Sequence, residues 1–82
     1  MQVHKHRLRE GLNTIQGVER LVFMDFLDSK LYGWFTTSPV FQLHEYEVYV
    51  ALTGEVVADK YRYVTSTQIN AGGGYYVLHA FD

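Results

Sequence analysis

Residues 43–52 read LHEYEVYVAL, and this stretch has the clearest alternation of apolar and polar side chains in the chain. One row of side chains is apolar or aromatic: Tyr46, Val48, Val50 and Leu52. The other row contains Glu45, Glu47 and Tyr49. Because successive side chains of a strand point to opposite faces, the pattern predicts a strand with one face against a core and one face in water.

Five other segments also have the length and composition of strands. They are VHKHRL (3–8), ERLVFMDFLD (19–28), LYGWFTT (31–37), YRYVTSTQI (61–69) and YYVLHAF (75–81). No segment combines the length and the periodicity of a helix, although residues 53–60 could form one helical turn. Six strands within 82 residues predict an all-β fold, a small antiparallel sandwich or barrel, in a single β-rich domain spanning 1–82.

Two segments allow more specific predictions. REGLNT (9–14) predicts a turn, with Gly11 and Asn13 available for positive φ. ERLVFMDFLD is apolar on both faces, which predicts a central strand covered on both sides. Its apolar residues also recur at a spacing of three, which is compatible with a helix, but the short run between turn residues favours a strand.

Glycines and turn residues indicate how the strands connect. DSK (28–30) predicts a tight hairpin connection into LYGWFTT. Gly33, inside that strand, marks either a bulge or a close approach by a bulky group. NAGGG (70–74) precedes strand-forming residues and no lysine, so it lacks the features of a phosphate-binding loop. It predicts a five-residue hairpin loop.

Composition and charge exclude several classes of function. The chain has no cysteine, so neither disulfides nor a thiolate zinc site can stabilise it. A net charge of −2 argues against a nucleic-acid binder that depends on phosphate contacts, although Lys5, Arg7 and Arg9 crowd the first nine residues. The apolar runs are too short for a transmembrane helix, and the first residues do not resemble a signal peptide. We therefore expect no membrane partner and an intracellular location.

The residues that could perform chemistry do not form a recognisable catalytic motif. His4 and His6 share one face of a strand and could chelate a metal ion, with His44 or His79 as further ligands. No Cys or carboxylate is spaced to complete that site, so an ordinary polar edge strand is the favoured interpretation. The serines lack a nucleophile motif, and Glu45 and Glu47 fit the solvent face of a strand. We expect neither an enzyme nor a bound cofactor or metal.

Aromatic residues are the most promising candidates for binding. Trp34 lies with Tyr32 in one predicted strand, and such a pair either fills the core, stacks a base or anchors a protein partner. Four tyrosines lie on the last two predicted strands, and they cannot all be interior in so small a protein. The candidate binding residues are Arg7, Arg9, Trp34, Tyr61, Tyr63, Tyr75 and Tyr76.

Several motifs together resemble a family of small phage-encoded proteins of unknown function. The matching pieces are HKHRL…GLNTI, a central Trp34, YEVYVALTGE, YRYVTSTQ and the closing GGGYYVLHAFD. Family members often have a proline soon after the N-x-I motif and a glycine before the Thr of the fifth strand. This chain has Gly17 without a proline, and Ser66 before Thr67. The resemblance implies a bacteriophage protein acting in the bacterial cytoplasm, and it brings no catalytic residues.

Two functional hypotheses follow from these expectations. The first is a non-enzymatic phage accessory protein that binds a host defence protein and masks its surface. The second is an oligomeric small-molecule sponge that sequesters a nucleotide immune signal between subunits, using Arg7, Arg9, Trp34 or the tyrosines. A metal-dependent enzyme using His4 and His6 is a third and less favoured possibility.

Overall fold

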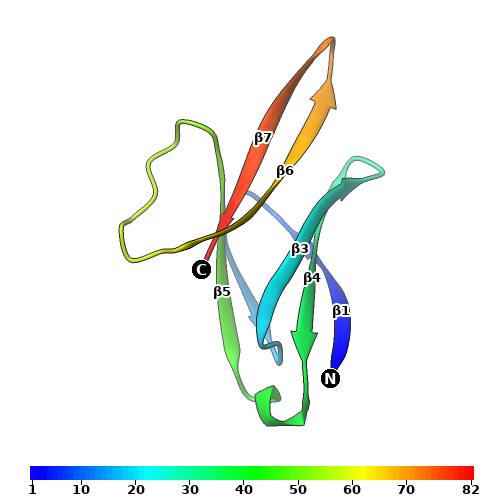
Figure 1. Ribbon diagram of the computed structural model, residues 1–82, viewed down its shortest axis with the longest axis vertical. Helices are drawn as coiled ribbons and strands as arrows, with labels where there is room; N and C mark the ends of the chain where they lie inside the picture. The colour runs from blue at the N-terminus through cyan, green and yellow to red at the C-terminus, as the bar shows by residue number, and fades with distance from the viewer.

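Seven strands and one short 3-10 helix make up the chain in a computed structural model that describes all 82 residues (Figure 1). The elements are β1 (Gln2–Leu8), β2 (Gly11–Gln16), β3 (Arg20–Leu27), β4 (Lys30–Thr37), η1 (Pro39–Phe41), β5 (Glu45–Leu52), β6 (Tyr63–Ala71) and β7 (Gly74–Phe81). They form two antiparallel sheets: sheet A with the order β1-β4-β3, and sheet B with the order β2-β5-β7-β6. The predicted all-β fold is confirmed, with one strand more than expected.

The core lies between the two sheets. Sheet A contributes Leu8, Leu21, Met24, Leu31 and Phe35, and sheet B contributes Tyr46, Val48, Val50, Ile69, Leu78 and Ala80. Phe35, which is fully buried, meets the ring of Tyr46 edge-on across the interface, with ring centres 6.0 Å apart. The alternation in LHEYEVYVAL therefore predicted the correct buried face of β5, because Glu45 and Glu47 are exposed.

The two sides of this sandwich differ. On one side β3 and β6, each an edge strand of its own sheet, approach each other. On the other side β1 and β2 are the edge strands, and the short connection Arg9–Glu10 joins them. A cleft opens between the first half of β1 and the end of β2.

The prediction of a turn over residues 9–14 is wrong, because most of this segment is strand β2, which pairs with β5. Gly11 does have a positive φ of 88°, but the chain is extended from there onward. The Asn13 carboxamide accepts a hydrogen bond from the backbone N–H of Arg9 (2.9 Å) and donates one to its carbonyl oxygen (2.8 Å). The side chain that favours turns therefore stabilises the short connection before the strand.

The prediction that residues 19–28 form a central strand covered on both sides is also wrong. The strand itself is confirmed as β3, but it lies at the edge of sheet A. Leu21 and Met24 face the core, whereas Val22, Phe23 and Leu27 are exposed. Nothing covers the outer face of a three-stranded sheet in this structure, so the second apolar row remains in solvent.

Both predicted hairpins are present, and one is tighter than expected. Asp28 and Ser29 form a two-residue turn between β3 and β4, with φ of 49° and 65°. The loop between β6 and β7 consists of Gly72 and Gly73 alone, also with positive φ, rather than five residues. Positive φ at both central residues is typical of the type I′ turn that matches strand twist. Residues 53–60 contain turns and no helical segment.

The one helical element spans only three residues, so the structure contains no helix that could cross a membrane.

Candidate functional site

The outer face of sheet A carries a cluster of aromatic and basic side chains. In the register of the sheet, Lys5 on β1 and Phe23 on β3 both lie opposite Trp34 on β4. Arg7 lies opposite Tyr32, the next outward residue of β4. Because outward residues alternate along each strand, these five side chains share one surface. We call Lys5, Arg7, Phe23, Tyr32 and Trp34 the aromatic–basic face.

The side chains of the aromatic–basic face contact one another. The ring centres of Phe23 and Trp34 are 5.2 Å apart, and those of Tyr32 and Trp34 are 6.5 Å apart. The ammonium of Lys5 lies 4.8 Å from the centre of the Tyr32 ring, within the range of a cation–π interaction. Phe23 is 52% exposed, Lys5 and Arg7 are exposed, and the two β4 rings are half-buried.

The charge on this face is unevenly distributed. Lys5 and Arg7 lie on the β1 side of the rings. On the β3 side Asp25 lies opposite Tyr32, and the one cation of β3, Arg20, lies opposite Thr36. The Asp25 carboxylate accepts a hydrogen bond of 2.8 Å from the backbone N–H of Phe26. The aromatic–basic face therefore has an apolar centre and a basic margin along β1.

The seven candidate residues named from the sequence fall in three separate places. Arg7 and Trp34 belong to the aromatic–basic face. Tyr63 begins β6 and Tyr61 lies two residues before it, and both are on the outer side of sheet B, where the Tyr61 ring packs on Tyr49. Arg9, Tyr75 and Tyr76 lie toward the end of the sandwich where the β6–β7 hairpin protrudes (Figure 1). None of the four tyrosines is buried, as expected, but they do not form one surface with Trp34.

A small cavity at that end lies between residues of both sheets. Its volume is about 290 Å³, and its lining includes Arg7, Arg9, Phe26 and Tyr76. A guanidinium group can pair with an anionic group, and a phenol ring can stack on a planar one. Pockets for small ligands have volumes of about 300–1,000 Å³, so this cavity is at the lower limit for enclosing one.

The outer face of sheet B carries a second aromatic cluster, centred on His79. The Nε2 atom of His79 lies 2.7 Å from Oγ1 of Thr53, and its Nδ1 atom lies 3.3 Å from the Tyr63 hydroxyl. The Tyr63 ring also meets Phe81 edge-on at 5.4 Å. His79 is thus a hydrogen-bonded, half-buried histidine at the rim, as predicted. A proton could pass between Thr53 and His79 along this hydrogen bond.

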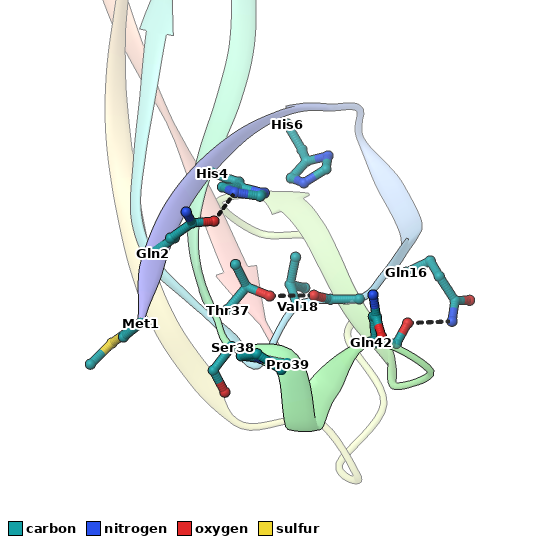
Figure 2. Close-up of a pocket in the computed structure, with 11 residues that line it drawn as sticks. Met1, Gln2, His4, His6, Gln16, Val18, Thr37, Ser38, Pro39 and Gln42 are labelled. Atoms are coloured by element: carbon teal, nitrogen blue, oxygen red, sulfur yellow. Dashed lines mark hydrogen bonds between the residues drawn. The ribbon is translucent and has the colours of Figure 1, made fainter.

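The cleft between β1 and β2 has a volume of about 570 Å³ and is mostly polar (Figure 2). His4 and His6 line it from β1, with ring centres 6.5 Å apart. Burial, followed by the neighbouring His4, lowers the pKa of His6. Across the whole chain, no three His, Cys, Asp or Glu side chains come close enough to form a metal site by themselves. His44 and His79 do not join the pair.

Sequence reasoning missed Lys5 and Phe23 as members of the candidate site, whereas it had paired Tyr32 with Trp34 without naming Tyr32 a binding residue. A signal for Phe23 was present, because a two-residue turn at Asp28 and Ser29 places Phe23 opposite Trp34 by counting back along the hairpin. No comparable signal existed for Lys5, because no turn connects β1 directly to β4. Its place depends on a pairing between distant parts of the chain.

No family model, no curated protein and no solved structure matches the chain.

Proposed function

We propose that this protein is a non-enzymatic binding protein that docks another protein on the aromatic–basic face and masks part of its surface. The observation that carries the proposal is the aromatic–basic face itself, in which an exposed Phe23 and two half-buried rings lie beside two cations on one uncovered sheet face. Trp, Tyr and Arg are the residues that most often dominate the binding energy of protein interfaces. An apolar centre with a charged margin is also the usual organisation of such interfaces.

Charge complementarity defines the partner more closely. The basic margin along β1 fits a partner surface that is apolar in the middle and acidic on one side. The resemblance to small phage-encoded proteins favours a bacterial host protein as that partner, and a defence factor in the cytoplasm is the most natural target for masking. This setting is part of the proposal.

The chain offers a matched pair of substitutions for the test. Lys5 lies over Tyr32 at 4.8 Å, and Lys60 lies over Tyr61 at 5.1 Å on a distant loop. Both lysines are exposed, so Lys5→Glu and Lys60→Glu remove similar local contacts. Only Lys5→Glu changes the charge of the aromatic–basic face, where it replaces one of the two cations with an anion. Folding of both variants is verified by circular dichroism.

The experiment captures proteins from a bacterial lysate on the immobilised wild-type chain and on each variant, then measures binding to the purified partner. We expect a stoichiometric complex with the wild type and with Lys60→Glu, and an affinity at least about tenfold weaker with Lys5→Glu. Equal binding by the two variants, or no protein retained preferentially by the wild type, contradicts the proposal.

The cavity near Arg9 and Tyr76 favours a second candidate function, the nucleotide sponge. Because the cavity is too small to enclose a dinucleotide, this function requires a second copy of the chain to complete the site. Thermal shift measurements with cyclic nucleotides and ADP-ribose derivatives test it. A melting temperature that rises in the wild type, but not in Arg9→Ala, supports the sponge, and flat curves across the panel exclude it.

A further inference from the structure

The cleft between β1 and β2 brings two imidazoles to one polar wall. Gln2, His4 and His6 alternate along β1 and face inward, because they pair with Thr37, Phe35 and Gly33 of β4. Figure 2 shows the two rings above Thr37 and Val18, with Gln16 and Gln42 across the cleft. The cleft is therefore lined largely by groups that form hydrogen bonds or bind metal ions.

One of these groups lacks a partner. The Nε2 atom of His6 is buried and forms no hydrogen bond, although its ring packs edge-on against Phe35 with centres 5.5 Å apart. Buried polar atoms are satisfied in the great majority of cases, and an exception calls for an explanation. A ligand bound at this nitrogen would provide the missing partner and explain the exception.

The neighbouring histidine is already oriented. Nε2 of His4 lies 3.1 Å from Oε1 of Gln2. Because a carboxamide oxygen only accepts, His4 donates its Nε2 proton in this bond, and Nδ1 keeps the lone pair. A hydrogen bond of this kind to the second ring nitrogen is the usual support of a metal-binding histidine.

We propose that the cleft binds one divalent late transition-metal ion, such as Zn²⁺, Ni²⁺ or Cu²⁺, through Nε2 of His6 and a ring nitrogen of His4. Imidazole is a preferred ligand of these ions. The chain provides only two ligands of this kind here, so water molecules, together with any carboxamide oxygen of the lining glutamines, complete the coordination. The site is independent of the aromatic–basic face, which lies on the other side of sheet A.

Metal binding requires both histidine side chains to move. With metal–nitrogen bonds of about 2.1 Å, two imidazoles on a tetrahedral ion have ring centres about 5 Å apart. The rings of His4 and His6 are 6.5 Å apart. His4 is exposed and can rotate toward the half-buried His6, and the His6 ring must turn so that its buried Nε2 atom faces the cleft.

The test uses the full chain with an acetylated N-terminus, because the terminal residue Met1 also lines the cleft and its amine could bind a metal. Calorimetric titration with ZnCl₂ should show one ion per chain. Removing a residue that only hydrogen-bonds to a metal ligand lowers metal affinity about 10- to 100-fold. His4→Gln removes a ligand itself, so it should weaken binding at least tenfold. His6→Gln should do the same, and the exposed His44→Gln should bind as the wild type does.

Spectroscopy provides a readout that depends on the ligands themselves. With one equivalent of Cu²⁺, electron paramagnetic resonance should show coupling to two imidazole nitrogens, reduced to one or none in His4→Gln. His6→Gln could unfold the chain because the ring packs on Phe35, but His4 is exposed and its variant remains decisive. No ion bound at submillimolar concentration, or wild-type affinity in His4→Gln, overturns the proposal.

Discussion

Gly33 occupies a position in β4 where any side chain would collide with the core. A Cβ atom there would lie 2.8 Å from Cδ1 of Leu8, 2.8 Å from Cδ1 of Leu21 and 2.9 Å from Cε1 of Phe35. The sequence predicted either a bulge or a close approach at this glycine, and the structure shows the close approach. Neighbouring side chains from β1 and β3 fill the space above its Cα.

Gly33→Ala should therefore destabilise the protein by about 1–3 kcal/mol, as overpacking of a well-filled core does. Gly74→Ala is the matched control, because Gly74 also lies in a strand and a Cβ atom there would meet no neighbouring atom within 4 Å. Urea unfolding followed by circular dichroism measures both changes. If the two substitutions lower the free energy of unfolding equally, then backbone freedom, rather than close packing, explains why a glycine occupies position 33.

At the scale of elements, the β3–β4 hairpin links a local turn to the candidate site. The two-residue turn fixes which residues of β3 and β4 lie opposite each other, from the pair of Leu27 and Lys30 next to the turn to the pair of Phe23 and Trp34. Beyond that pair the register shifts between Leu21 and Phe23. The bulge allows Leu21 to face the core while Phe23 remains outside. The sequence could therefore predict the strand pairing in the half of the hairpin next to the turn. It could not predict the register shift beyond Phe23, which depends on packing against sheet B.

Ser29→Gly should stabilise this hairpin. Ser29 has a φ of 65°, a left-handed conformation that costs a residue with a Cβ roughly 1–2 kcal/mol relative to glycine. Part of that gain is lost to the greater freedom of glycine in the unfolded chain, so we expect a net increase of up to about 1 kcal/mol. Urea unfolding of Ser29→Gly measures the increase.

Ser66→Gly provides the opposite case, because Ser66 is exposed in the middle of β6 with extended backbone. It should lower the free energy of unfolding by about 0.5–1 kcal/mol. If both glycine substitutions destabilise the chain, the left-handed turn is not a source of strain.

Strand β2 shows where local signals fail. GLNTIQ contains a glycine and an asparagine, which favour turns when neighbours are ignored. In the structure the segment pairs with β5 along its whole length, and the Asn13 side chain caps the preceding connection. Pairing with a strongly alternating strand thus overrides a weak local preference.

At the scale of the whole molecule, Asp82, which follows β7, forms hydrogen bonds with Arg62, next to the start of β6, and with Tyr46 of β5. Asp82 exchanges two backbone hydrogen bonds with Arg62, at 2.7 and 2.8 Å, and its carboxylate accepts a hydrogen bond of 2.6 Å from the Tyr46 hydroxyl of β5. Burial, followed by the hydrogen bond to Asp82, raises the pKa of Tyr46. The folded chain therefore retains a phenol proton at pH values where the unfolded chain releases it.

This difference makes stability depend on alkaline pH. The contribution of Tyr46 is complete below the unfolded pKa of about 10 and is lost as the pH rises toward the higher folded pKa. Tyr46→Phe should cost about 1.5–3 kcal/mol at neutral pH, as expected for a hydrogen bond to a charged group, and should show a shallower alkaline decline than the wild type.

Urea unfolding between neutral pH and the alkaline range tests this, with Tyr76→Phe as the control because its hydroxyl contacts no partner. An alkaline slope in Tyr46→Phe equal to that of the wild type would show that other groups cause the decline.

Local sequence patterns were enough to predict the buried face of β5, where the two hairpins turn and that the chain is all β. These properties follow from the two-residue period of a strand and from the φ preferences of turn residues, both of which are local. The positions of Lys5 beside Trp34, of Phe23 in solvent and of His6 in a cleft emerge only in the folded molecule. Each of these depends on pairing and packing between strands far apart in the chain, and such pairing is selected by the fit of the two sheets as a whole.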